Sequence, residues 1–308
     1  MSLAVVFPGQ GSQSVGMLAA LGAAEPAVRA TFAEASGVLG YDLWQLCQQG
    51  PEEALNATER TQPAMLAAGV AVWRAWQARG APTPAMLAGH SLGEFSALVC
   101  GGALEFRDAV ALVQFRARVM QEAVPPGLGA MAAVLGLADT EVEAACAAAA
   151  QGEVVEPVNY NSPGQLVIAG HAAAVARAVA DCKARGARRA LVLPVSVPAH
   201  SSLLLGAGER LRERLATVAL RTPSIPVCAI GQRAHGDAAA MRDAVVAQLA
   251  SPVRWADTVR HMVAQGATRI VECGPGKVLT ALNRRIERNK DIAMLAIEDP
   301  AGLAAAPM

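Results

Sequence analysis

One serine stands in a sequence context that could make it a nucleophile. Ser91 is the centre of the five residues Gly-His-Ser-Leu-Gly at 89–93, which have the pattern G-x-S-x-G. An apolar run at 84–88 precedes them and a helix-compatible run at 94–99 follows, as in a strand, a sharp turn and a helix. Glycine is expected at 89 and 93 because the strand and the helix approach so closely that a side chain would clash. The pattern arises easily by chance, so its meaning depends on the rest of the chain.

A serine is a poor nucleophile unless a base takes its proton, and the chain has five histidines. His200 is the candidate base because it ends an apolar stretch, and strand ends of a parallel sheet line the active crevice. His90 adjoins the serine, so the turn should point it elsewhere, and a structural or solvated role is expected for it and the other three. No acid between Ser91 and His200 stands on a loop after a strand, where a hydrolase triad would need it. The residues therefore predict a Ser–His pair that is oriented by a group other than a carboxylate.

An arginine falls on the apolar face of a helix predicted at 104–124. Apolar residues recur there at helical spacing, and Arg116 shares their face while Arg118 points roughly the opposite way. A guanidinium in apolar surroundings is costly unless an anion pairs with it. Three interpretations are open: an internal ion pair with Asp or Glu, a side chain that reaches out to solvent, or a bidentate contact with a ligand carboxylate.

Alternating strands and helices would position these residues. Continuously apolar runs followed by glycine-rich turns are typical of strands in a parallel sheet with both faces covered. Such runs occur at 3–7, 84–88, 225–230 and 269–273. With helices between them, the pattern predicts a large, α/β-hydrolase-like domain built on a mostly parallel, doubly wound sheet. The low-complexity tail after Asp299 is expected to be frayed.

The order of predicted strands and helices changes after a Pro-Pro-Gly stretch at 125–127. Strand-like and helical segments then follow in the order β-α-β-β-α-β, which matches a ferredoxin-like unit. We therefore predict a small ferredoxin-like subdomain at 128–195, inserted into a large catalytic domain formed by residues 1–127 and 196–308.

Composition excludes several classes of protein. The 308 residues are 53% hydrophobic and 17% charged, with a formal net charge of zero. These values argue against disorder and against a protein built to bind nucleic acid or an anionic membrane surface. The six cysteines show no C-x-x-C spacing, and neither a signal peptide nor a run of membrane-spanning length is found. A cytoplasmic, metal-free protein is expected, and a monomer is favoured.

Six parts of the chain together resemble the malonyl-CoA:acyl carrier protein transacylases, in particular the stand-alone bacterial enzymes of type II fatty-acid synthesis. The resemblance runs in order from about residue 3 to residue 290 with almost no gaps. The six parts are the loop 8–13, the turn 89–94, Arg116, the segments 159–165 and 195–200, and the turn 274–277.

The resemblance implies a ping-pong reaction that needs no cofactor. Ser91 would attack the coenzyme A thioester malonyl-CoA, and the phosphopantetheine thiol of acyl carrier protein would then take the malonyl group. His200 would act as general base and then as general acid, and the backbone N–H groups of Gln10 and Leu92 would form the oxyanion hole.

The resemblance also implies roles for binding residues. Arg116 would hold the malonyl carboxylate, which selects against acetyl-CoA, and Asn161 would be a further substrate-binding residue. Gln248 matches the position whose carbonyl orients the histidine. The best contacts for the acidic carrier protein would be three arginines, Arg188, Arg189 and Arg285.

The sequence departs from the family pattern at two places, and it leaves several alternative functions to be considered. Leu204 stands where the family often has methionine, and the segment 228–231 lacks the asparagine that is common there, which leaves the contacts near His200 in doubt. A serine acyl hydrolase or thioesterase would use the same Ser91 and His200 without needing Arg116. The same transacylation could also serve a malonate decarboxylase or a polyketide system, and a non-enzymatic docking subunit is a further alternative.

Overall fold

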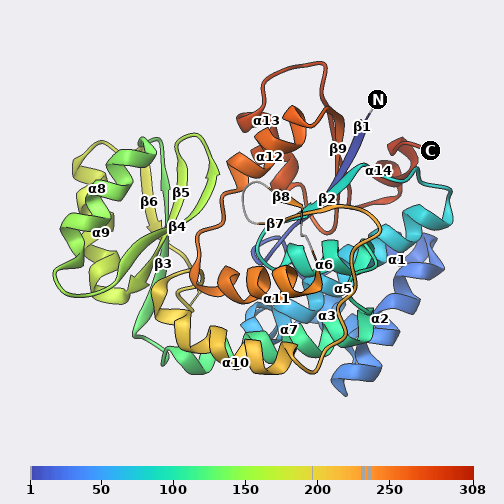
Figure 1. The fold of residues 1–308 in the computed structure, drawn as a ribbon, viewed down its shortest axis with the longest axis horizontal. Coiled ribbons are helices and arrows are strands. Elements are labelled where there is room, and N and C mark those ends of the chain that lie inside the picture. The colour runs from blue at the N-terminus through green and yellow to red at the C-terminus, as the bar shows by residue number, and fades with distance from the viewer. Residues whose placement is uncertain (1, 196, 230–232, 235–236) are drawn as a thin grey trace.

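A six-stranded sheet forms the centre of the larger part of the protein (Figure 1). The structure is a computed structural model, and it describes residues 2–195, 197–229, 233–234 and 237–308. The strand order is β10-β9-β1-β2-β7-β8, and neighbouring strands run parallel except for the pair β7 and β8. The predicted parallel α/β sheet is thus confirmed. The strands are β1 (Ser2–Phe7), β2 (Met86–Gly89), β7 (Val227–Ala229), β8 (Arg233–Ala234), β9 (Ala267–Cys273) and β10 (Ala293–Ile297).

Helices cover both faces of this sheet because the side chains of a strand alternate between its faces. In β1, Val5 and Phe7 belong to the main core with α5, α6 and α7, whereas Ala4 and Val6 pack with α12 and α13 on the other side. The helices are α1 (Ala19–Ala24), α2 (Pro26–Leu39), α3 (Leu43–Gln49), α4 (Glu52–Asn56), α5 (Thr58–Ala78), α6 (Gly93–Cys100), α7 (Phe106–Ala123), α10 (Leu205–Leu215), α11 (Ala238–Ala247), α12 (Trp255–Ala264), α13 (Val278–Ile286) and α14 (Pro300–Ala305). Two short 3₁₀ helices are η1 (Ser202–Leu204) and η2 (Gln248–Ala250).

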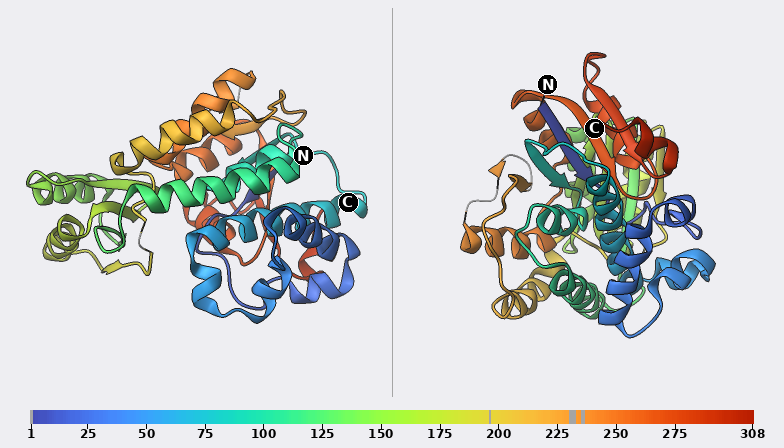
Figure 2. Two further views of the ribbon diagram at one scale, coloured as in Figure 1. Left: turned by 90° about the horizontal axis from the view of Figure 1, so that it is seen from below. Right: turned by 90° about the vertical axis from the view of Figure 1, so that its right-hand side faces the viewer.

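A second, antiparallel sheet lies at one end of the molecule with two helices on it (Figure 2). Its strand order β4-β5-β3-β6 and its chain order β-α-β-β-α-β are those of the predicted ferredoxin-like unit. The division at 128–195 remains our proposal for the domain boundary. The elements are β3 (Gly129–Leu135), α8 (Asp139–Ala150), β4 (Val155–Ser162), β5 (Gln165–His171), α9 (Ala172–Ala184) and β6 (Arg189–Val192).

Strand β4 joins the small subdomain to the large domain. The backbone N–H of Tyr160 donates to the carbonyl of Val253, and the N–H of Val253 donates to the carbonyl of Val158, both at 2.8 Å. The guanidinium of Arg254 lies 4.4 Å from the centre of the Tyr160 ring. These contacts tie β4 to the chain between η2 and α12.

The prediction of a frayed tail is wrong. Strand β10 pairs in parallel with β9, and the side chain of Asp299 caps α14 by accepting from the N–H of Gly302 at 2.7 Å. Leu303 is buried, and the buried indole of Trp76 donates to the carbonyl of Pro307 at 2.9 Å. The alanine-rich sequence hides these contacts because its two large apolar residues, Leu303 and Met308, are too few to give a periodicity.

None of the helices in the described ranges is both long enough and apolar enough to cross a membrane.

The turn between β2 and α6 is pressed against the end of β1. The N–H of His90 donates to the carbonyl of Phe7 at 3.0 Å. A Cβ at Gly93 would lie 2.0 Å from that same carbonyl oxygen, and a Cβ at Gly89 would lie 1.9 Å from the carbonyl carbon of Gly93. The expected need for glycine at both positions is confirmed, because no side chain can be accommodated between these backbones.

We expect Gly93→Ala to destabilise the protein by about 3 kcal/mol or more, at the upper end of the range for overpacking, because the obstructing atom is backbone and cannot turn away. Gly37→Ala is the matched control, since Gly37 lies in α2 and nothing would lie within 4 Å of its Cβ. That control should gain about 0.5–1 kcal/mol from helix propensity. Urea unfolding of both variants measures the difference, and equal stability of the two would contradict the steric argument.

Candidate active site

One cavity brings together the residues that were predicted to do chemistry. Ser91, His200, Arg116, Gln10 and Leu92 all line it, and its volume is about 430 Å³. They come from the turn after β2, the loop before η1, α7 and the loop after β1, which are distant in the sequence. Ser91 has a φ of 52°, a left-handed conformation that is uncommon for a residue with a side chain. The strained elbow expected at this position is present.

Ser91 and His200 form a hydrogen-bonded pair. Ser91 Oγ lies 2.7 Å from His200 Nε2, and His200 Nδ1 lies 2.7 Å from the main-chain carbonyl oxygen of Gln248. A carbonyl can only accept, so Nδ1 carries the proton and the lone pair of Nε2 faces the serine hydroxyl. The serine therefore donates to a histidine whose tautomer is fixed by a backbone group rather than by a carboxylate.

The histidine is held in its neutral form. It is 3% exposed, and burial lowers its pKa from 6.5 to about 3, with a further lowering by the positive charge of Arg116. Backbone hydrogen bonds with Gln248 and Ser251 act in the opposite direction. At neutral pH, Nε2 is consequently free to accept a proton.

Arg116 is almost completely buried and is held by two glutamines. Its Nη1 donates to Gln62 Oε1 at 2.8 Å and its Nη2 donates to Gln248 Oε1 at 2.9 Å. Its buried Nε has no hydrogen-bond partner. Burial lowers its pKa to about 10, against the opposite effect of Glu94, so the guanidinium remains charged at neutral pH. Because both glutamine acceptors are neutral and the Nε–H has no acceptor, this wall of the cavity is suited to a bound anion.

The side chain of Gln248 connects the arginine to the nucleophile. While its Oε1 accepts from Arg116, its Nε2 donates to the carbonyl oxygen of Ser91 at 3.0 Å and to the buried carboxylate of Glu94. Gln248 was predicted only for its carbonyl. Its side-chain contacts join residues more than 130 positions apart in the sequence and therefore leave no local signal.

The loop after β1 lies beside the elbow. A Cβ on Gly9 would lie 2.4 Å from the carbonyl oxygen of His90, so the two backbones are in contact. Within the described part of the chain, neither the N–H of Gln10 nor that of Leu92 donates a hydrogen bond. Both residues line the cavity, and Leu92 directly precedes α6. Free N–H groups at a helix start are suited to an oxyanion.

The surroundings of Asn161 and His90 differ from the expectation. The side-chain oxygen of Asn161 lies 2.8 Å from His90 Nε2, and Asn161 does not line the cavity within the described residues. Asn159, which the sequence did not single out, lines it instead, and its buried Oδ1 has no partner. His90 also lines the cavity rather than pointing away from it, and burial lowers its pKa. The pairing of β4 with β5 is irregular between Tyr160 and Ser162, so regular strand alternation could not have predicted which asparagine lines the cavity.

A second hollow, of about 590 Å³, contains two of the arginines that were expected to meet a carrier protein. Arg188 and Arg285 line it together with Arg288, which the sequence analysis missed. Arg285 Nη1 donates to Gln165 Oε1 at 2.8 Å, across the gap between α13 and the small subdomain. Arg189 is exposed at the start of β6 but does not line this hollow.

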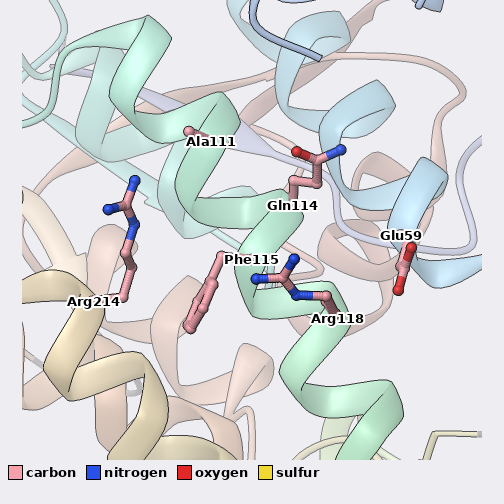
Figure 3. A pocket seen from close by; sticks show the side chains of 6 residues that line it. All are labelled: Glu59, Ala111, Gln114, Phe115, Arg118 and Arg214. Carbon is pink, nitrogen blue, oxygen red and sulfur yellow. The ribbon is translucent and has the colours of Figure 1, made fainter. Parts of the chain in front are cut away.

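A third hollow lies on the outer side of α7 and contains Arg118 (Figure 3). The Arg118 side chain is 54% exposed, whereas Arg116, half a turn away, is buried. The expected opposite orientation of the two arginines is confirmed. The residues lining this hollow are Glu59, Ala111, Gln114, Phe115, Arg118 and Arg214.

Leu204 and Cys228, which belong to the two sequence departures, do not line the cavity. Leu204 is fully buried in the main core, and Cys228 is buried against the α12 side of the sheet. Ile230 and Gly231 lie outside the described residues. All six cysteines are free thiols, and no cluster of three or more potential metal ligands occurs in the described ranges.

Known proteins with related sequences and structures are acyltransferases. A family model described as an acyl transferase domain matches residues 4–297. A protein of Salmonella typhimurium named malonyl CoA-acyl carrier protein transacylase is 55% identical over 304 residues, covering 98% of both chains.

Two solved structures match over the full length as well. An acyl carrier protein S-malonyltransferase from Vibrio cholerae is 54% identical, with a TM-score of 0.94 over 99% of both chains. A type II PKS acyl-carrier protein in complex with its malonyl-transacylase gives a chain that is 51% identical, with a TM-score of 0.97 over 99% of both chains.

The buried neutral His200 should make the protein less stable in acid. Its pKa in the folded protein, about 3, lies below 6.5, so the unfolded chain binds the proton first as the pH falls. The stability that this group contributes is complete above about pH 6.5 and is lost towards pH 3, at up to about 1.4 kcal/mol per pH unit. Urea unfolding at pH 7, 6 and 5 should therefore show a smaller loss of stability in His200→Asn than in the wild type. Parallel curves for the two proteins would contradict this assignment.

Proposed function

The chain belongs to the acyl transferase family, and from this membership we propose that it transfers a malonyl group from malonyl-CoA to the phosphopantetheine thiol of an acyl carrier protein. The observation that carries the proposal is a buried, charged Arg116 with an unpartnered donor, in the same cavity as the Ser91–His200 pair. A thioester acyl group that ends in a carboxylate has the two functional groups that this cavity can bind. The activities after which the Salmonella and Vibrio relatives are named support the same substrate and acceptor.

In the first half-reaction, Ser91 Oγ attacks the thioester carbonyl of malonyl-CoA and its proton passes to His200 Nε2. The negative charge that develops on the carbonyl oxygen is stabilised by the N–H groups of Gln10 and Leu92. When the intermediate collapses, the C–S bond breaks and His200 returns the proton to the sulfur of coenzyme A. The products are a malonyl-Ser91 ester and free coenzyme A.

In the second half-reaction, the carrier thiol gives its proton to His200 and attacks the ester carbonyl. The C–O bond to Ser91 breaks, and the proton on His200 goes to Oγ, which restores the enzyme. The imidazolium that forms twice in the cycle is stabilised by the carbonyl of Gln248. Nucleophile, base and anion site are all supplied by the chain, so the proposed reaction requires no cofactor.

Arg116 selects the acyl group. A malonyl carboxylate would pair with the guanidinium, whereas an acetyl group would leave the buried charge unpaired. We propose that Asn161 acts on the substrate site indirectly, because its side chain contacts the ring of His90, which lines the cavity. A plain thioesterase would have no use for a buried arginine in this position.

The hollow between α13 and the small subdomain is our proposed carrier docking surface. Arg188, Arg285 and Arg288 line it, and within the described residues none of the three forms an ion pair with a carboxylate. Unpaired positive charges attract an acidic partner and speed its approach. We include Arg189 on the adjacent strand. Because one close structural relative is bound to a type II PKS carrier, a polyketide carrier is an acceptor to test beside a fatty-acid carrier.

We further propose that the protein acts in the cytoplasm as a monomer. Six free cysteines, five of them buried, fit a reducing compartment.

Mass spectrometry after mixing with malonyl-CoA should show a malonyl adduct on Ser91. The adduct should be absent in Ser91→Ala and strongly reduced in Arg116→Ala, by roughly 100-fold in rate for the loss of a charged hydrogen-bond partner. Arg118→Ala is the matched control on the same helix and should react like the wild type.

Acetyl-CoA provides the discriminating comparison. An acetyl adduct that forms as fast as the malonyl adduct would refute the role of Arg116 in selection. Rapid release of malonate to water, in place of transfer to a carrier thiol, would favour the hydrolase alternative.

Reversing the charges of Arg188, Arg189 and Arg285 to Glu should raise KM for the carrier protein by about tenfold or more, because exposed charges mainly steer association. Transfer to a small thiol should stay intact. The control replaces three exposed arginines elsewhere, Arg107, Arg118 and Arg214, by Glu, which changes the net charge of the protein by the same amount. An equal rise in KM in both triple variants would show a nonspecific charge effect and overturn the assignment.

A further inference from the structure

The small subdomain reaches the loop of the catalytic histidine through one carboxylate. Glu156 lies on β4, and its Oε2 accepts from the backbone N–H of Ser202 at 2.8 Å. Its Oε1 accepts from the hydroxyl of the same Ser202, also at 2.8 Å. Ser202 begins η1 and follows His200 by two residues. Two charge-assisted hydrogen bonds therefore fix the chain directly after the base.

The backbone at His200 needs such support. His200 has a φ of 67°, in the left-handed region, which costs a residue with a side chain about 1–3 kcal/mol and persists only where the surroundings hold it. On the side of the large domain, its N–H donates to the carbonyl of Leu249 at 3.0 Å and its ring contacts Gln248. Beyond the histidine, the chain is held by Glu156.

Glu156 is itself on a firmly placed strand. β4 is hydrogen-bonded to Val253, and Val253 follows η2, the element that supplies Gln248 and Leu249. The histidine loop is thus held on one side by η2 and on the other by a strand that is tied to the end of η2. The carboxylate on that strand therefore links the end of the loop at Ser202 to the same element, η2, that holds His200 directly.

We propose that Glu156 is a positioning residue for the base: it holds the His200 loop so that Nε2 faces Ser91 Oγ. This inference rests on the proposed role of His200. It assigns the inserted subdomain a part in the chemistry in addition to carrying docking arginines.

The test compares Glu156→Ala with Glu156→Gln. A glutamine can keep both contacts, because its oxygen accepts from the Ser202 N–H while its amide nitrogen donates to the Ser202 hydroxyl. At saturating malonyl-CoA, the rate of Ser91 malonylation should fall roughly 10- to 100-fold in Glu156→Ala, the cost of a misplacement on the order of 1 Å. Glu156→Gln should stay within about threefold of the wild type on the same physical grounds. KM for malonyl-CoA should change little in either variant, because Arg116 is untouched.

Glu153→Ala is the matched control. Glu153 belongs to the same subdomain and pairs with Arg177 at 2.8 Å, away from the histidine loop. Its loss should leave the malonylation rate unchanged. Ser202→Ala removes one of the two hydrogen bonds and should give an intermediate rate, which keeps the proposal testable if Glu156→Ala does not fold.

A second readout is independent of the malonyl substrate. Phenylmethanesulfonyl fluoride sulfonylates an activated serine: the Oγ–S bond forms, the S–F bond breaks, and the serine proton leaves through the base with fluoride. Its rate with Ser91 should fall in Glu156→Ala and recover in Glu156→Gln. If the wild type reacts with this probe but not with malonyl-CoA, the proposed substrate fails while the role of Glu156 is still measured.

Two results would overturn the proposal. The first is Glu156→Ala reacting with the probe as fast as the wild type and Glu153→Ala. The second is an equal loss of rate in Glu156→Ala and Glu156→Gln that follows their melting temperatures, since that would show a purely structural role.

Discussion

The arrangement of the active site depends on the buried amide of Gln248. Its main-chain oxygen accepts from His200, its side-chain oxygen accepts from Arg116, and its side-chain nitrogen donates to the carbonyl of Ser91. An amide has one accepting and one donating end, so the arginine and the serine turn cannot exchange places. Glu94 reinforces this orientation because a carboxylate accepts only from the nitrogen end. One buried residue therefore fixes His200, Arg116 and Ser91 relative to one another.

The charge of Arg116 also acts on His200, which would link selection of the acyl group to proton transfer. Burial lowers the pKa of His200, and the positive charge of Arg116 lowers it further. A carboxylate bound to Arg116 offsets that charge, so its arrival raises the basicity of the histidine. An acyl group without a carboxylate leaves both the arginine unpaired and the base weak. If Arg116 holds the acyl carboxylate as we propose, the cavity penalises such a group in binding and again in the chemical step, which a hydrogen bond to the substrate alone would not do.

The parts of the site with a local sequence signature could be predicted, and those made by distant contacts could not. Ser91 was identified by glycines at fixed spacing, and Arg116 by its place on an apolar helix face. The contacts of Gln62 and Gln248 with Arg116 join different helices, and Glu156 reaches the histidine loop from another sheet, so neither leaves a periodic pattern. The fold shows the same division. The apolar strands and the β-α-β-β-α-β order could be predicted, whereas β10 and α14 are fixed by pairing with β9 and by Trp76.

The place of the insertion in the chain explains how a small subdomain can affect a distant serine. The chain leaves the large domain after α7, which carries Arg116, and returns through the loop that carries His200. Both ends of the insertion therefore adjoin elements that line the cavity. Because β4 is hydrogen-bonded to Val253 and Glu156 holds Ser202, a movement of the subdomain cannot leave the histidine loop unchanged. Arg285 donates a hydrogen bond to Gln165 between α13 and the small subdomain. A partner bound in the hollow lined by Arg188, Arg285 and Arg288 would therefore contact the same subdomain that holds the His200 loop.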